Sequence, residues 1–203
     1  MSTNADLQKL CQLAVSKGAS AAKPMSARGV IIDPRVRLKC MVPTCNNYGW
    51  NLMCPPNVMP IDQFIEVLRQ YDHALLIQYP IPLDRELIKA QEGRRLEHIM
   101  EKGDYAERLN RSEVEFTELL GEVEKEALAM GHRFATALSG GACHLCHECV
   151  GQRSGEKCRH PFRSRPSMEA MSIDVLLTAQ NAGLPFEMPP RDRPVWNGLV
   201  LVD

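Results

Sequence analysis

The sequence predicts an α/β fold, in which helices flank a small sheet and irregular cysteine-rich loops leave the strand ends. Segments with apolar residues at helical spacing alternate along the chain with short apolar runs of strand length. Seven of the eight cysteines gather in two turn-rich segments without either periodicity. A chain of 203 residues is long enough to bury a core of its own. We therefore expect a single domain over residues 1–203.

The net charge of the chain limits the classes of partner that we expect it to bind. With 24 basic and 25 acidic residues the net charge is −1, so bulk charge favours neither nucleic acid nor an anionic membrane. Residues 1–6 show no positive stretch followed by an apolar run, and the apolar stretches, such as residues 74–77, are strand-sized. We expect a cytoplasmic protein. In that reducing compartment clustered cysteines indicate metal binding rather than disulfides.

Residues 6–17 form the first expected helix. Leu7, Leu10 and Ala14 fall on one face, and a glycine ends the pattern. Cys11 shares that apolar face, which favours its interpretation as a small core hydrophobe.

The next elements surround the first cysteine group. Residues 30–32 and 36–38 have strand character but are separated by Asp33-Pro34, which cannot continue a ladder of hydrogen bonds. Residues 60–71 are expected to form a helix, and residues 74–80 a buried strand that ends at proline. The apolar face of that helix consists of Phe64, Val67, Leu68 and Tyr71.

Residues 84–130 are expected to form two helices with a break near Gly103. The second helix has an apolar face and an acidic face that we interpret as solvated. The apolar residues are Phe116, Leu119, Leu120, Val123, Ala127 and Met130, and the acidic residues are Glu113, Glu115, Glu118, Glu122 and Glu126. Gly131 ends this helix, and residues 132–138 are a strand candidate.

The C-terminal part is expected to hold one helix and one strand. Ser167 is a candidate cap for a helix that runs to Asn181, with Met168 and Met171 in the core. Residues 196–202 alternate weakly and are expected to close the sheet as its last strand.

A cysteine triplet carries the strongest functional signal. Cys143, Cys146 and Cys149 recur every third residue, and Cys158 follows. Ferredoxin loops have this spacing, because three thiolates on one tight turn reach separate irons of a 4Fe–4S cluster. A single zinc ion usually takes two sulfurs from one Cys-x-x-Cys pair and two ligands from a distant pair. The triplet therefore favours an iron–sulfur cluster, with zinc as the alternative.

A second cysteine group lies nearer the N-terminus. Cys40, Cys45 and Cys54 fall within fifteen residues, in a segment rich in turn formers that let the backbone fold around a buried ion. This spacing favours metal binding over a cluster of buried thiols. Tyr48 and Trp50 are expected to shield the site from water.

Histidines and cations accompany the triplet. His144 and His147 suggest a mixed Cys/His zinc site, but histidines so placed more often face solvent or donate to cluster sulfurs. Between Arg153 and Arg165 there are six basic or potentially basic residues and one acid. They are expected to balance the negative charge of a thiolate-ligated cluster. The alternative is a surface for a redox partner protein or a small anionic ligand.

The paired motifs are Cys-x4-Cys-x2-Tyr-Gly-x4-Cys-Pro-Pro and Cys-x-x-Cys-x-x-Cys-x8-Cys-Arg-His-Pro. Together they resemble a prokaryotic family of unknown function, whose members are described only as predicted metal-binding proteins. The segments Arg-Pro-Ser-Met-Glu-Ala and Gly-Leu-Pro fit as well, so the likeness runs from about Arg28 to the C-terminus. It implies metal binding but no particular reaction. The cysteines that match are Cys40, Cys45, Cys54, Cys143, Cys146, Cys149 and Cys158.

Two functions from different classes remain open. The first is electron transfer with a redox partner through one or two 4Fe–4S clusters. The second is catalysis, in which a cluster held by three cysteines leaves one iron open to bind a small substrate as a Lewis acid. Seven cysteines could supply four ligands to one cluster and three to another, and Cys11 or a non-cysteine ligand would complete the second set. A purely structural zinc site is a third alternative.

The two cysteine groups are expected to meet in space, because ferredoxins commonly complete a cluster with a remote cysteine. Cys54 and Cys158 are the best candidates to cross between the groups. The polar loops at residues 44–57 and 142–166 are expected to be held by metal, whereas the helices persist without it.

Overall fold

The computed structural model describes residues 4–83, 104–187 and 194–203. Within them, five α-helices and a four-stranded antiparallel sheet confirm the expected α/β class. The helices are α1 (Asn4–Ser16), α2 (Leu38–Met41), α3 (Ile61–Leu68), α6 (Asp104–Ala129) and α7 (Val175–Asn181). The strands are β1 (Ala21–Ser26), β2 (His73–Pro80), β3 (Thr136–Leu138) and β4 (Val195–Val202). None of the described helices is both long and apolar enough to cross a bilayer.

The sheet has the strand order β1-β2-β4-β3, and every neighbouring pair is antiparallel. β2 and β4 pair along their whole length, from His73 opposite Val202 to Pro80 opposite Val195. The last strand of the chain therefore lies inside the sheet and not at its edge. β3 pairs only with β4, and its end leads directly to the cysteine triplet.

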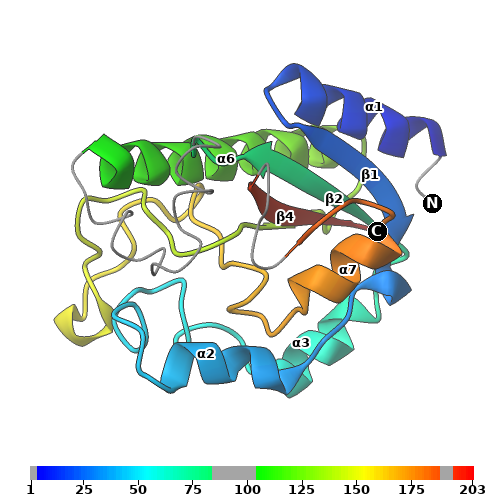
Figure 1. The fold of residues 1–203 in the computed structure, drawn as a ribbon. Helices are drawn as coiled ribbons and strands as arrows, with labels where there is room; N and C mark the ends of the chain where they lie inside the picture. Colours follow the sequence, from blue (N-terminus) through cyan, green and yellow to red (C-terminus); the bar gives the residue numbers. More distant parts are fainter. Residues whose placement is uncertain (1–3, 84–103, 188–193) are drawn as a thin grey trace.

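Helices cover both faces of the sheet (Figure 1). Leu75 and Ile77 of β2 pack with residues of α1 and α6, whereas Ala74 and Leu76 pack with residues of α3 and α7 on the opposite side. Successive side chains of a strand point to opposite faces. A strand buried on both sides is therefore apolar at consecutive positions, which explains why the alternation in the β4 sequence is weak.

The N-terminal half departs from the expected strands. Residues 30–32 make only an isolated bridge, between Ile32 and Ile173, and Pro34–Arg37 form a 3-10 helix that leads into α2. The strand expected at residues 36–38 is therefore wrong. The Asp33 side chain accepts a hydrogen bond from the backbone N–H of Arg35, and a proline directly after such a cap has its φ already set for a helix.

β1 was not expected from the sequence, and it contains Pro24. A proline cannot donate to a ladder of hydrogen bonds and is tolerated mainly on edge strands. β1 pairs only with β2 and is such an edge strand.

The helix expected from Ser167 to Asn181 begins later in the structure. Ser167 does not begin a helix: its hydroxyl accepts from the N–H of Ala170 within a turn, and α7 starts later, capped by Asp174. Met168 and Met171 are nevertheless in the core, as expected.

In α3, Val67 is 37% exposed and is not part of the buried face. The first expected helix in residues 84–103 lies outside the described residues.

α6 corresponds to the second helix expected in residues 84–130. Its face with Phe116, Leu120 and Val123 is fully buried, as predicted. The acidic face is solvated at its four later glutamates, but Glu113 is buried. That correction matters for the site, because Glu113 faces the cysteine triplet.

Packing of α6 on β4 gives a first prediction. A Cβ on Gly198 of β4 would lie 2.6 Å from Leu120 Cδ1 and 2.7 Å from Phe116 Cζ. Gly198→Ala should lower the free energy of unfolding by about 1–3 kcal/mol through overpacking. Gly121→Ala on α6 is the matched control, since nothing lies within 4 Å of its added Cβ. It should raise stability by up to about 1 kcal/mol. Urea unfolding measures both, and equal effects would contradict this packing.

Candidate metal centre

The two cysteine groups lie at the same end of the molecule, beside one another (Figure 1). The Asn51 side-chain amide donates to the carbonyl oxygen of Cys143 at 3.1 Å. A Cβ on Gly151 would stand 3.1 Å from the Trp50 ring, so the backbone of the second loop packs against that ring. The expectation that the groups meet in space is confirmed, although more than eighty residues separate Cys54 from Cys143 in the sequence.

Four thiols of the second motif line one cavity. They belong to Cys143, Cys146, Cys149 and Cys158. The space in the cavity, part of it open to solvent, is about 330 Å³. Its other walls come from both loops: Asn51, Leu52, Met53, Leu145, Val150, Arg159, His160 and Ser164. Apolar side chains (Leu52, Met53, Leu145 and Val150) and polar ones from both loops thus share the walls of this cavity.

Hydrogen-bond donors reach two of these sulfurs. The backbone N–H of His160 donates to Cys158 Sγ at 3.4 Å, and the Ser164 hydroxyl lies 3.4 Å from the same sulfur. Burial raises the pKa of the Cys143 thiol, and the backbone N–H of Leu145 partly offsets that rise. Donors at sulfur stabilise the thiolate form, which is the form that binds metal.

The thiols also lie close enough to influence one another. Burial raises the pKa of Cys143, and the neighbouring Cys158, Cys149 and Cys146 raise it further. Four thiolates in one enclosed cavity would repel each other. Such a set becomes anionic most readily when a metal supplies the opposite charge.

The first cysteine group meets the second at Cys54. Burial raises the pKa of Cys54 to about 12, and Cys45, Cys40, Cys143 and Cys149 add to the rise in that order. Cys54 thus lies among thiols of both groups, as expected for a crossing residue. Cys158, the other candidate, lines the cavity of its own motif.

Cys11 is separate from both groups. It is buried in the core that α1 and α6 form with the sheet, and burial raises its pKa to about 11. This agrees with its interpretation as a core residue.

Among the described residues, no group of three or more His, Cys, Asp or Glu side chains is arranged to hold a metal ion. The role of the seven motif cysteines as ligands, Cys40, Cys45, Cys54, Cys143, Cys146, Cys149 and Cys158, stays a prediction.

The histidines of the triplet take different positions. His144 Nε2 lies 2.9 Å from Glu113 Oε2, and this hydrogen bond raises the pKa of His144 against the opposing effect of burial. His147 is exposed. Helical spacing could have identified Glu113, because it precedes Phe116 and Leu120 by three and seven residues and so shares their buried face.

A second carboxylate that the sequence did not single out belongs to Glu169, which is half-buried, with its Oε2 atom shielded from solvent. Burial raises the pKa of the Glu169 carboxyl, and nearby donors on its own backbone, on Ser167 and on Gly141 partly offset that rise. The Glu169 charge in turn contributes to the raised pKa of Cys40.

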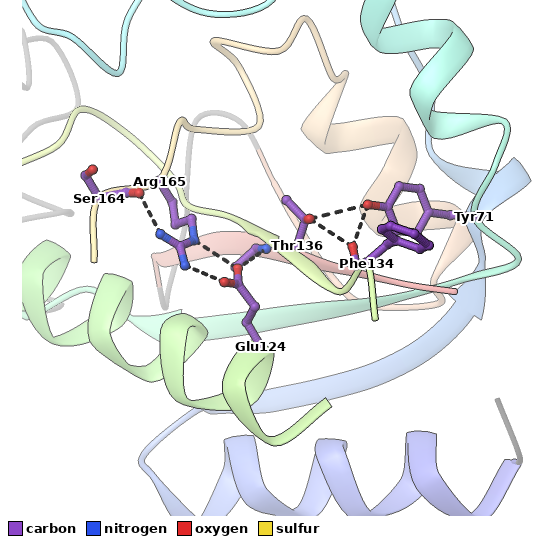
Figure 2. Close-up of polar contacts among 7 residues, drawn as sticks. Tyr71, Glu124, Phe134, Thr136, Ser164 and Arg165 are labelled. Atoms are coloured by element: carbon purple, nitrogen blue, oxygen red, sulfur yellow. Dashed lines mark hydrogen bonds and ion pairs between the residues drawn. The ribbon is translucent and has the colours of Figure 1, made fainter. Parts of the chain in front are cut away.

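Part of the basic segment is bound to α6. Figure 2 shows the Arg165 guanidinium facing the Glu124 carboxylate, with Nε 2.9 Å from Oε2. Both side chains are mostly buried, at 17% and 10% exposed. The same Glu124 oxygen accepts the backbone N–H of Ala137 in β3. Arg165 also donates to the Ser164 carbonyl, so the ion pair ties the end of the Cys158 loop to helix and sheet.

Other cations of this segment stay at the surface. Arg163 pairs with Glu118 on α6, where both side chains are about half exposed. Arg153, Lys157 and Arg159 are exposed, and Arg159 donates to the carbonyl of Glu148 in the triplet loop. Among the described residues, Arg159 is the arginine that lines the cavity, so charge balance at the thiols falls mainly to it.

An open groove adjoins the cavity and has about 940 Å³ of space, including open solvent. Cys146 and Cys149 line both. The groove is otherwise lined by Trp50, His147, Glu148, Val150, Glu156, Arg159 and His160. Trp50, expected to shield the first group, is 40% exposed and forms a wall of this groove.

Comparison with known proteins gives one finding. A family model with the description "Predicted metal-binding protein (DUF2284)" matches residues 23–202. Searches of curated proteins and of solved structures each found no significant match. The matched range includes both cysteine groups and excludes α1 with Cys11.

The ion pair between Arg165 and Glu124 of α6 gives a second prediction. Arg165→Met would leave the buried Glu124 carboxylate without its cation and should lower the free energy of unfolding by about 3–5 kcal/mol. Arg163→Met is the matched control. Its pair with Glu118 is exposed, so the loss should be at most about 1 kcal/mol. Urea unfolding measures both variants, and a small effect for Arg165→Met would show that the pair does not hold the loop.

The pair of His144 and Glu113 gives a third prediction, for metal-free protein. The pKa of His144 should lie above 6.5, and Glu113→Gln should lower it. A raised pKa favours the protonated ring in the folded state. The added stability is therefore full below about pH 6.5 and is lost as the pH rises through the raised value. NMR titration of the ring tests the pKa. Urea unfolding of both proteins at about pH 5.5 and about pH 8.5 tests the linkage. An unchanged pKa in the variant would contradict the pairing.

Proposed function

Because the chain belongs to the DUF2284 family of predicted metal-binding proteins, we propose that it is an iron–sulfur protein for electron transfer. In this proposal Cys143, Cys146, Cys149 and Cys158 hold a 4Fe–4S cluster. The observation that carries it is that these four thiols line one cavity. In cluster ligation each thiolate binds a different iron, so the sulfurs surround a common volume rather than converge on one point.

The surroundings of the cavity fit an anionic cluster. The N–H groups of Leu145 and His160 donate to ligand sulfurs, and Arg159 lines the wall. Donors and cations near cluster sulfurs raise the reduction potential, and apolar walls limit the access of water. Leu52, Leu145 and Val150 supply such walls.

Cys40, Cys45 and Cys54 support a second cluster beside the first. Cys54 interacts electrostatically with Cys143 and Cys149, so ligands of the two groups lie near each other. Clusters of this type, when bound, take up and release single electrons. Two adjacent sites at one end of the molecule suit a path from a redox partner on the surface to the buried centre. The partner would dock near the exposed cations Arg153 and Lys157.

A second candidate function is catalysis at an iron that lacks a thiolate. The first group has only three cysteines, and the groove beside Cys146 and Cys149 has room for a small ligand. Its lining includes Arg159, His147 and His160, which suit an anionic substrate. A structural zinc site is the third alternative.

The fourth prediction concerns the metal itself. Protein purified without oxygen should be brown, contain iron and acid-labile sulfide, and absorb broadly near about 400 nm, where such thiolate clusters have charge-transfer bands. Colourless protein with stoichiometric zinc and no sulfide would contradict the proposal. A spectral change on addition of small anions, without reduction by any partner, would favour the catalytic alternative.

Replacement of a ligand extends this test. Cys146→Ser should reduce the iron content and make residues 153–165 more sensitive to protease, while far-ultraviolet circular dichroism keeps most of its helical signal. The helices pack on the sheet in a core that does not include the loops. Cys11→Ala is the matched control and should keep all its iron. Loss of iron in both variants would point to general unfolding instead.

A further inference from the structure

Asn51 is buried within the first cysteine loop, residues 40–57, and each of its polar atoms has a partner. Only 3% of the residue is exposed. Its side-chain oxygen accepts the backbone N–H of Met53 at 2.9 Å, and its side-chain nitrogen donates to the carbonyl of Cys143 at 3.1 Å. Its backbone N–H donates to the carbonyl of Asn47 at 3.0 Å. The two side-chain bonds fix the orientation of the amide, because a flipped amide would turn its oxygen toward the carbonyl.

The same residue is hydrogen-bonded to a cysteine of each group. The Asn51 carbonyl accepts the backbone N–H of Cys54 at 3.0 Å and the side-chain amide of Asn57 at 2.9 Å. Its side chain reaches Cys143, 92 positions away in the chain. Among the described residues, no other hydrogen bond joins the first loop to the second loop, residues 142–166. Asn51 is therefore the polar connection between the two loops.

Trp50, the neighbour of Asn51, adds an apolar contact between the loops. A Cβ on Gly151 would lie 3.1 Å from atoms of the Trp50 ring. The ring is 40% exposed, whereas Asn51 is buried and lines the cavity of the four thiols. Loss of a buried hydrogen bond leaves a donor or an acceptor without a partner, which is more unfavourable than the loss of an exposed one. The position of Cys143 relative to the first loop thus depends on the Asn51 amide.

We propose that Asn51 is a positioning residue that couples the two cysteine groups. Order in one loop is transmitted to the other through the hydrogen bonds of Asn51 to Cys54 and to Cys143. This link follows from the geometry of the chain and does not depend on which metal the loops hold. Its consequence for the clusters rests on the proposed function: occupancy of either site favours occupancy of the other. Thermodynamic linkage makes the effect equal in both directions.

The irregular structure of the loops makes such coupling effective. Residues 44–57 and 142–150, all of them described, contain no helix or strand. A loop without regular structure loses much conformational entropy when it becomes ordered. If one loop is already held in place, Asn51 is held with it, and the other loop then loses less entropy on ordering.

The fifth prediction measures the coupling by thiol reactivity in the full chain, purified without oxygen. Asn51→Asp keeps the size of the side chain and the acceptor for Met53 but removes the donor to Cys143. Iodoacetamide should alkylate Cys143, Cys146 and Cys149 about fivefold faster in the variant, the factor that corresponds to the net contribution of one hydrogen bond. Mass spectrometry of the peptides gives the rate at each cysteine. Wild-type rates at these three cysteines would overturn the proposal.

Asn57→Asp is the matched control. It makes the same change from amide to carboxylate in the same loop, but the bond that it breaks, to the carbonyl of Asn51, stays within that loop. The second-loop cysteines should therefore keep their wild-type rates in this variant. Equal acceleration in both variants would overturn the proposal, because added charge or a loosened first loop would then explain it. Cys11, buried in the core, should react at the wild-type rate throughout, which shows that the fold is intact.

The reverse direction is measured with Cys146→Ser, which alters the second loop only. This variant should speed the alkylation of Cys40, Cys45 and Cys54, and the acceleration should disappear when Asn51→Asp is also present. Unchanged rates in the first loop of Cys146→Ser would overturn the coupling. Wild-type protein with zinc in place of iron and sulfide would overturn the proposed function, whereas the differences in rate among the variants would still support the role of Asn51.

Discussion

The arrangement of the two cysteine loops, residues 40–57 and 142–166, depends on electrostatic repulsion among their clustered thiolates. Cys54 lies near four other cysteines, and its pKa is raised to about 12 by burial and by those neighbours. Neutral thiols can be close together without penalty, but thiolates need a compensating charge. The loops supply little of it: Arg159 lines the cavity, while Arg163 and Arg165 pair with carboxylates of α6. In the proposed iron–sulfur protein, the metal supplies the remainder.

The rest of the fold serves to bring the two loops together. β3 ends at the triplet loop and is held by β4 on one edge and by Glu124 of α6 at Ala137. The same Glu124 fixes Arg165 at the far end of the loop. A sheet covered on both faces is a rigid base for these attachments. Loop positions are thereby set by buried contacts, although the loops themselves have little regular structure.

Local patterns explain which elements could be predicted. β2 and the buried face of α6 follow from periodicity within one segment, because each element is decided by its own residues. β1 was not expected, and its proline is acceptable only because the order β1-β2-β4-β3 places β1 at an edge. The strand expected at residues 36–38 is instead helical from Pro34 onward, where the Asp33 cap outweighed β propensity.

The sequence alone determined the α/β class and the two cysteine groups, because spacing between neighbouring ligands is a property of the chain. The family match to residues 23–202 adds metal binding to that result. Only the tertiary structure decided that Cys54 lies near Cys143 and Cys149, and that Glu113 is buried beside His144 of the triplet loop. Each of these relations joins segments far apart in the chain. Burial and charge at such a junction arise from packing, which no local pattern encodes.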